Sequence, residues 1–161
     1  MLEEDLLDIE KKSFFVEKLR IMAKNVKANS KKEEYKLKNL EFLKEMAQQE
    51  GVITHKSGVL FKVLQQGTGQ VSPNLRSIVS VHYRGELING REFDNSWERS
   101  CPEALRLVEV IDGWKIALQE MHVGDRWMVY IPAKYGYGDR ASGPIPANST
   151  LIFEIELFSI A

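Results

Sequence analysis

The side chains that most often carry covalent or metal chemistry are few and scattered in this chain. Its three histidines, His55, His82 and His122, lie far apart in the sequence, and none has the spacing of a pair of metal ligands. Cys101 is the single cysteine, and it could act as a nucleophile only with a histidine beside it in space. Residues 67–69, Gly-Thr-Gly, lack the strand-then-helix context of a phosphate-binding loop. We therefore expect no metal, no cofactor and no covalent intermediate.

Aromatic residues are the remaining candidates for a functional site, because the strand-rich part of the chain holds more of them than one core obviously needs. They are Tyr83, Phe93, Trp97, Trp114, Trp127, Tyr130, Tyr135, Tyr137 and Phe153. Trp127 and Tyr130 lie on an alternating strand and are expected to be ordinary core or surface residues. Tyr135 and Tyr137 stand in a glycine-rich loop, which has no regular face to bury them. We predict that these two line or cover a groove.

The element expected to position the aromatic residues is a short helix at residues 112–124. Its apolar residues recur at the i, i+3, i+4 and i+7 spacing of one helix face. They are Trp114, Ala117, Leu118 and Met121. Asp112 could cap the start of this helix, and Gly124 could end it in the left-handed conformation. The tryptophan then stands where a strand gives way to the helix, between the sheet and the helix.

From Val52 onward, the sequence around this helix has the period of two that is typical of strands. Strands are expected near residues 59–64, 78–83, 104–111, 127–131 and 150–159. An Asn89-Gly90 pair adds a hairpin signal. The fold class that follows is α+β, with an antiparallel sheet of five or six strands wrapped around one short helix.

The first 50 residues have a helical period instead, and we predict two amphipathic helices joined near residues 25–30. Ser30 and Glu33 have the spacing of a capping box, and Gly51 could end the second helix. Two such helices bury little apolar surface alone, so they either pack on the C-terminal domain or pair with a second copy of the chain. We favour pairing. The expected organisation is a helical dimerisation region at 1–50, a linker at 51–57 and a domain at 58–161.

Composition narrows the range of partners. The chain has 161 residues, 43% of them hydrophobic and 28% charged, and its formal net charge is −1. This balance gives no electrostatic reason to expect nucleic acid, and no run approaches the roughly 18 apolar residues of a membrane span. The acidic N-terminus favours a cytoplasmic protein, or a periplasmic one if a signal segment has been removed. With one cysteine, no intrachain disulfide is expected.

Five separate motifs, in order, resemble the successive signatures of FKBP-type peptidyl-prolyl cis-trans isomerases. They are VHYRG at residues 81–85, NGREFDNS at 89–96, VIDGW at 110–114, YGYG at 135–138 and IPANSTLIFE at 145–154. The resemblance covers roughly Gly58 to Ala161 and keeps order and spacing throughout. N-terminal helices before such a domain are similar to the bacterial macrophage-infectivity-potentiator-like branch, whose members dimerise through those helices.

The resemblance implies an apolar pocket for proline with Trp114 as its floor. The other walls that it implies are Tyr83, Phe93, Val110, Ile111 and Phe153. It also implies that the Ile111 amide and the Tyr137 hydroxyl donate hydrogen bonds to the peptide's carbonyl groups, and that Ile145 flanks the entrance. Such a site fits a reaction that needs no nucleophile, the rotation of an X-Pro peptide bond.

Three further positions can be compared with the pattern of the family. Asp94 stands where the family has its pocket aspartate, and Arg99 stands where the arginine partner of that aspartate is expected. The pair would keep the carboxylate ionised beside an apolar wall, since a lone buried charge is costly. Leu105 departs from the pattern, because relatives usually carry a phenylalanine in this strand. The substitution removes one aromatic wall, and either lower activity or a changed preference for the residue before proline follows.

The function implied by the resemblance is a peptidyl-prolyl isomerase that assists protein folding. Its implied partners are proline-containing polypeptide clients, the macrolide inhibitors of the family, and a second copy of the chain bound through the N-terminal helices. The alternative is a weakly catalytic or non-catalytic module that binds proline-containing segments as a chaperone. Leu105 keeps this alternative open.

Overall fold

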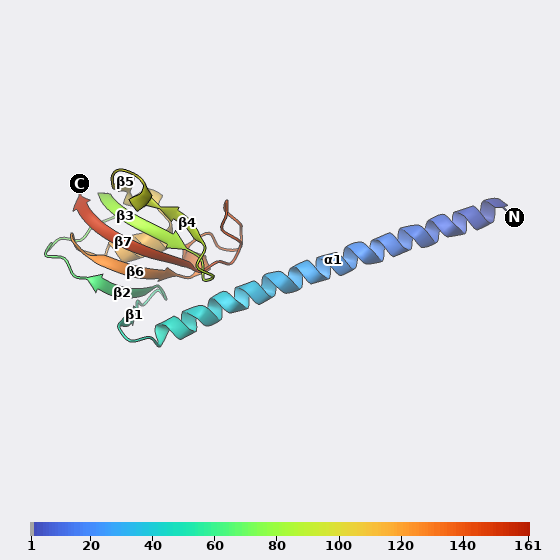
Figure 1. Ribbon diagram of the computed structural model, residues 1–161, viewed down its shortest axis with the longest axis horizontal. Helices are drawn as coiled ribbons and strands as arrows, with labels where there is room; N and C mark the ends of the chain where they lie inside the picture. Colours follow the sequence, from blue (N-terminus) through green and yellow to red (C-terminus); the bar gives the residue numbers. More distant parts are fainter. Residues whose placement is uncertain (1) are drawn as a thin grey trace. The chain divides into compact units, whose positions relative to one another are not determined.

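The computed structural model describes residues 2–161, with side chains from residue 5 onward, and it consists of a long helix followed by a sheet (Figure 1). Two compact units are present, one ending at Tyr35 and the other spanning Lys36–Ala161. The last turns of the long helix therefore belong to the same unit as the sheet. No helix in residues 2–161 has an apolar stretch long enough to cross a membrane.

The N-terminal region is one continuous helix, α1 (Leu2–Ala47), and the prediction of two helices was wrong. Residues 25–30 contain neither glycine nor proline, so nothing interrupts the ladder of backbone hydrogen bonds there. Ser30 lies inside the helix, where a capping box has no free amides to satisfy. Gly51, at φ +80°, lies in the turn that follows α1, where a glycine adopts the left-handed conformation without strain.

Seven antiparallel strands form one sheet, in the order β1-β2-β6-β7-β3-β4, with β5 also paired to β3 (Figure 1). The strands are β1 (Val52–Thr54), β2 (Leu60–Gln65), β3 (Ile78–Glu86), β4 (Glu92–Asn95), β5 (Glu103–Arg106), β6 (Arg126–Ile131) and β7 (Leu151–Ile160). The antiparallel α+β architecture is confirmed, and the strand count is higher than the five or six expected. One added strand, β1, lies in residues 51–57, the expected linker, and pairs with β2.

Alternation along the strands places apolar side chains on both faces of this sheet. On β6, Trp127, Val129 and Ile131 point into the main core, while Tyr130 points to the opposite face. Tyr130 joins Leu60 and Ile152 in a smaller cluster. The last turns of α1 cover this cluster with Phe42, Leu43, Met46 and Ala47. The alternation predicted for β6 is confirmed.

The short helix beneath the main core, α2 (Asp112–Leu118), is shorter than the predicted residues 112–124. Its predicted apolar face is confirmed: Trp114, Ala117, Leu118 and Met121 are all buried. Ile111, not Asp112, is the N-cap, because the Ile111 carbonyl accepts from the Trp114 and Lys115 amides at 3.0 and 3.2 Å.

Two glycines and one turn fix the surroundings of α2. A Cβ on Gly113 would lie 2.4 Å from the Ile131 side chain, so this glycine lets α2 pack directly against β6. Gly124, at φ +92°, does not end the helix but belongs to the turn before β6. The strand expected at residues 104–111 stops at Arg106, because the 3₁₀ turn η2 (Leu107–Glu109) follows it with Leu107 fully buried.

Candidate functional site

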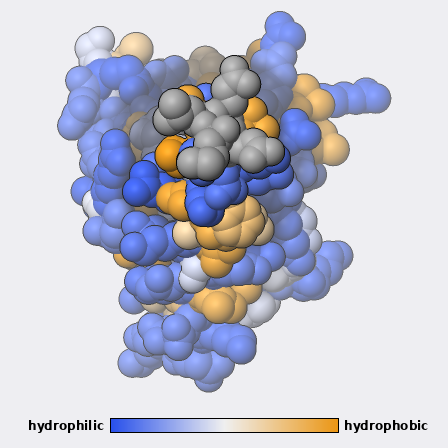
Figure 2. Space-filling model, turned by 90° about the vertical axis from the view of Figure 1, so that its right-hand side faces the viewer, coloured by the Kyte–Doolittle hydropathy of each residue, from blue (hydrophilic) through white to orange (hydrophobic). Residues whose placement is uncertain are grey.

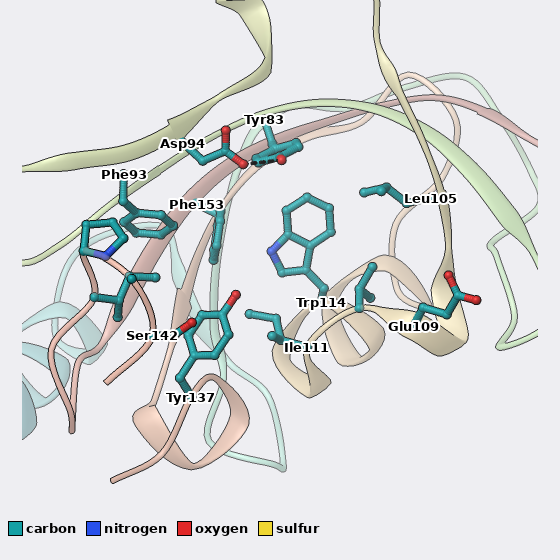
Figure 3. Close-up of a pocket in the computed structure, with 14 residues that line it drawn as sticks. Tyr83, Phe93, Asp94, Leu105, Glu109, Ile111, Trp114, Tyr137, Ser142 and Phe153 are labelled. Atoms are coloured by element: carbon teal, nitrogen blue, oxygen red, sulfur yellow. Dashed lines mark hydrogen bonds between the residues drawn. The ribbon is translucent and has the colours of Figure 1, made fainter. Parts of the chain in front are cut away.

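An open pocket of about 490 Å³ lies over the N-terminal end of α2 (Figure 3). Its volume is within the usual range of small-ligand sites. Ten of the eleven predicted site residues line it, drawn from β3, β4, β5, β7, α2 and the loops beside them. They are Tyr83, Phe93, Asp94, Leu105, Val110, Ile111, Trp114, Tyr137, Ile145 and Phe153. Arg99, the eleventh, is absent from the lining but donates hydrogen bonds to the lining residues Asp94 and Tyr83.

Four aromatic rings form the floor and one wall of the pocket in edge-to-face pairs, the arrangement that ring quadrupoles favour. Trp114 and Phe153 are buried, with ring centroids 5.3 Å apart and planes at 89°. Tyr83 meets Trp114 at 4.9 Å and 86°, and Phe93 meets Phe153 at 5.5 Å and 88°. Each ring is fixed by another, so the concave apolar surface is present before any ligand arrives.

Gly85 makes this packing possible. A Cβ at that position would lie 2.6 Å from the Phe93 ring and 2.7 Å from the Phe153 ring. Residue 85 pairs with both Asp94 on β4 and Phe153 on β7, so the two rings meet over the β3 backbone. The glycine of the VHYRG motif is therefore required by the close approach of the rings.

A polar wall adjoins the aromatic one. The Tyr83 hydroxyl donates to Asp94 Oδ2, and Arg99 donates to Asp94 Oδ1 at 2.9 Å. Arg99 also donates to the Tyr83 hydroxyl at 3.3 Å and to Glu103 at 2.8 Å. Both carboxylate oxygens of Asp94 are thus occupied by donors.

These contacts set the charge states of the wall. Burial acts to raise the pKa of Asp94, but the hydrogen bonds from Tyr83 and Arg99 outweigh it and leave the pKa below its ordinary value. Burial, followed by the hydrogen bond to Asp94, raises the pKa of Tyr83 to about 12. At neutral pH the wall therefore holds an ionised carboxylate, a neutral phenol and a guanidinium.

Two hydrogen-bond donors face the pocket without an acceptor among the described residues. Ile111 lines the pocket, and its backbone amide makes no hydrogen bond within residues 2–161. The Tyr137 hydroxyl points into the pocket near Ile111 and is likewise unpaired within that range (Figure 3). Both are placed to donate to a bound ligand.

Tyr137 is held by a compact loop rather than by a regular element. The loop starts at the 3₁₀ turn η3 (Ala133–Tyr135), and the Gly138 amide donates to the Ala133 carbonyl at 2.8 Å. Asn148 donates from its amide to the Gly138 carbonyl, also at 2.8 Å. Tyr135 does not line the pocket, contrary to prediction, because its ring packs partly buried against the main core.

The sequence did not single out four lining residues: Glu109, Ser142, Gly143 and Pro144. Ser142 and Ile145 exchange two backbone hydrogen bonds of 2.9 Å, and these close a tight turn at the pocket mouth. Glu109 ends the η2 turn, which was expected to be a strand. The Gly-Pro pair beside Ile145 could have predicted the turn. No sequence pattern indicated that Glu109 would line the pocket.

The three histidines lie outside the pocket lining and have local structural partners. His55 bonds the Ser57 hydroxyl and His82 bonds the Ser96 hydroxyl, both at 2.8 Å. The His122 amide donates to Asp125 at 2.9 Å.

Comparison with known proteins gives two family matches that together cover most of the chain. Residues 69–158 match the family described as FKBP-type peptidyl-prolyl cis-trans isomerase. Residues 4–63 match the domain amino terminal to FKBP-type peptidyl-prolyl isomerase.

Individual relatives agree with these matches. The FKBP-type peptidyl-prolyl cis-trans isomerase FkpA of Aeromonas hydrophila is 40% identical over 134 residues, which cover 83% of this chain and 50% of the relative. The peptidyl-prolyl cis-trans isomerase Mip of Coxiella burnetii is 43% identical over 124 residues, which cover 76% of this chain and 54% of the relative. This chain therefore spans only about half the length of these curated relatives.

Solved structures show the same similarity. The crystal structure of FkpA from Escherichia coli matches with a TM-score of 0.77 at 34% identity, covering 84% of this chain and 63% of that one. A peptidyl-prolyl cis-trans isomerase from Pseudomonas syringae matches with a TM-score of 0.74 at 35% identity, covering 80% of this chain and 95% of that one.

Proposed function

Because the chain belongs to the FKBP-type peptidyl-prolyl cis-trans isomerases, we propose that it catalyses rotation about X-Pro peptide bonds in the pocket over α2. The observation that carries the proposal is that an open, aromatic-floored pocket brings together ten of the eleven residues selected from the motifs. The pocket also has two donors available to a peptide backbone.

The chemistry required is the weakening of a partial double bond. Rotation about a peptide bond has a barrier of about 18 to 20 kcal/mol, because twisting the bond removes amide resonance. Water stabilises the polar planar form. Transfer of the prolyl amide into a pocket with a Trp114 and Phe153 floor removes that water and so favours the less polar twisted form. No bond is made or broken.

The donors and the polar wall complete the mechanism. The Ile111 amide and the Tyr137 hydroxyl hold the peptide's carbonyl groups, so that one side of the X-Pro bond is fixed while the other turns. Asp94 acts as a fixed negative charge beside the reacting amide. It does not act as a base, because both of its oxygens already accept hydrogen bonds. Arg99 is a positioning residue that keeps this carboxylate and the Tyr83 ring in place.

A protease-coupled assay tests the proposal on tetrapeptides that differ in the residue before proline. We expect the full chain to accelerate cis-to-trans exchange above the uncatalysed rate, and a macrolide inhibitor of the family to suppress the acceleration. A folded chain that binds the macrolide but gives only the background rate for every tetrapeptide would contradict the enzymatic proposal.

That outcome would support a second candidate, a module that binds proline-containing segments with little turnover. Leu105 favours this candidate, since it lines the pocket where relatives usually carry an aromatic ring. A missing ring leaves the remaining walls able to hold a proline but reduces the apolar enclosure of the amide. Client binding with little acceleration separates the module from the enzyme.

We also propose that two copies of the chain pair through the first part of α1. Residues 5–35 expose many large apolar side chains, and the space-filling view shows hydrophobic groups among hydrophilic ones at the molecular surface (Figure 2). They include Leu6, Ile9, Phe14, Phe15, Ile21 and Val26, each at least 50% exposed. Monomers rarely leave so much apolar surface open. Pairing covers it and sets two pockets to serve one unfolded client.

A further inference from the structure

One buried polar contact connects the last turns of α1 to the pocket loop. Asn39 is only 2% exposed, and its Oδ1 accepts a hydrogen bond of 2.8 Å from the backbone amide of Thr150. The Thr150 hydroxyl donates in turn to the Asn39 backbone carbonyl at 3.4 Å, and Thr150 is 1% exposed. These two residues are 111 positions apart in the chain.

The contact differs in kind from the apolar packing of α1 on the sheet. Phe42, Leu43 and Met46 pack against an apolar cluster, and such packing tolerates small shifts of the helix along the sheet. A buried amide is satisfied only at hydrogen-bond distance and angle, and leaving it unpaired is costly. Asn39 therefore fixes one position of the loop base relative to the helix.

Thr150 occupies a point from which both sides of the pocket are set. It directly follows the loop that carries Tyr137 and Ile145, and it directly precedes β7, which carries Phe153. The loop is already closed upon itself by the bond from Asn148 to Gly138. Anchoring residue 150 thus limits movement of the closed loop as a whole.

We infer that Asn39 is a positioning residue for the pocket, and that it holds the Tyr137 loop in its binding geometry from the back of the sheet. The inference rests on the proposed isomerase function. Without this anchor the loop must be ordered by the substrate itself, so binding weakens more than turnover. The helical region of the chain then contributes directly to the site, in addition to any pairing between copies.

The test compares three full-length variants in the tetrapeptide assay. Asn39→Leu keeps the branching at Cγ but removes the acceptor, and we expect KM to rise about tenfold with kcat changed by less than about twofold, as the loss of one buried hydrogen bond would give. Asn39→Asp keeps an oxygen at the same place, and we expect a KM near that of the unchanged chain together with a lower melting temperature, because a carboxylate is then buried. Leu43→Ala weakens the packing of the same helix, and we expect a lower melting temperature with KM unchanged.

Two further measurements make the result decisive. Hydrogen exchange of the Thr150 amide should be slow in the unchanged chain and fast in Asn39→Leu. If Asn39→Leu does not fold, Thr150→Val removes only the hydroxyl bond, and we expect KM to rise about twofold. An equal rise of KM in Leu43→Ala and Asn39→Leu would overturn the inference.

Failure of the inference is distinguishable from failure of the proposed function. If the unchanged chain gives no acceleration, the function has failed. Affinity for a fluorescent Ala-Leu-Pro-Phe peptide then replaces KM in the same comparison. Equal affinity in Asn39→Leu and the unchanged chain would overturn the positioning role on its own.

Discussion

Two apolar surfaces of this protein face solvent, and they differ in almost every other respect. The pocket is concave, and its rings are fixed against one another in perpendicular pairs. The first part of α1 is convex, and its apolar side chains project singly from a helix. A concave surface can enclose a few residues of an extended chain, whereas a convex stripe buries area only against another long element. The apolar residues at the two places are therefore suited to different kinds of partner.

The last turns of α1 belong to the same helix as the exposed apolar residues of its first part, but their own apolar residues are covered. Phe42, Leu43 and Met46 find a sheet face to cover, while Phe14 and Ile21 find none within the described chain. Burial is determined by whether a complementary surface is in reach.

The largest expected effect comes from the pocket floor. Trp114→Leu removes the indole that meets both Tyr83 and Phe153. We expect macrolide affinity to fall about 10- to 100-fold, or about 1.4 to 2.7 kcal/mol, while the helical signal of the chain remains. Fluorescence titration measures the affinity. Trp127→Leu is the matched control, since Trp127 lies outside the pocket lining, and it should leave the affinity unchanged.

The next effect concerns the polar wall and depends on pH. Asp94 has a lowered pKa, so the stability it contributes is present above the ordinary carboxyl pKa and is lost as pH falls through the folded value. We expect Asp94→Asn to reduce kcat/KM about tenfold at neutral pH by removing the fixed charge. We also expect this variant to lose less stability than the unchanged chain when denaturant unfolding is repeated below about pH 4. Parallel acid curves for the two proteins would contradict the assigned charge state.

Alkaline pH gives a separate prediction for the same wall. The Tyr83 pKa is raised to about 12, so its contribution to stability is complete below the ordinary phenol pKa of about 10 and disappears as pH rises through about 12. Spectrophotometric titration should show two phenols ionising later than exposed tyrosines, because burial also raises the pKa of Tyr130. Tyr83→Phe should remove one of the two late steps, and a titration unchanged by this substitution would contradict the assignment to Tyr83.

The next prediction concerns pairing through the first part of α1 and is measured as a twofold change in the mass of the particle in solution. Phe14→Glu with Ile21→Glu places charges on the exposed stripe, and we expect the sedimentation mass to fall from two chains to one. Tetrapeptide isomerisation should stay the same, because the pocket is untouched. Lys11→Gln with Lys24→Gln makes the same formal change in charge on the same helix and should leave the mass at two chains. A single-chain mass for the unchanged protein would refute the pairing.

The smallest effect is expected at the pocket rim. Leu105→Phe adds the aromatic wall that the resemblance to the family implies at this position, and we expect kcat/KM to rise about two- to threefold through better enclosure of the prolyl amide. The gain should depend on the residue before proline. Val108→Phe adds the same ring on the neighbouring turn at an exposed position outside the lining, and it should have no effect.

Periodicity was sufficient to predict the sheet and the buried face of α2, whereas most of the pocket residues were implied by the resemblance to a known family. The alternation of core-facing and outward-facing side chains on β6 can be predicted from neighbouring residues alone. The helix start predicted at Ser30 was wrong because a capping pattern acts only where a helix begins. The residues around Ser30 allow the helix to continue. A strand of three residues such as β1 is too short to show a period.

Contacts between segments far apart in the chain could not be predicted from the sequence, because no local pattern records which partner a residue meets. Asn39 looked like one more polar residue on a helix, since its partner lies 111 residues away. The Ser142 turn depends on backbone bonds to Ile145 that no side-chain pattern records. Tyr135 and Tyr137 share a loop, yet only the fold decides that one ring faces the core and the other faces the pocket.

Gly85 has a consequence for how such a protein could change its choice of client. One stretch of the cleft is bare main chain pressed against two rings, so no exchange of amino acids at that point can widen, narrow or recharge it without driving Phe93 or Phe153 aside. Leu105, Glu109 and Ser142 also line the pocket, but they stand on a short strand and on turns, where that restriction does not apply. Substitutions that change which peptide the pocket accepts are therefore expected at these positions and not at residue 85.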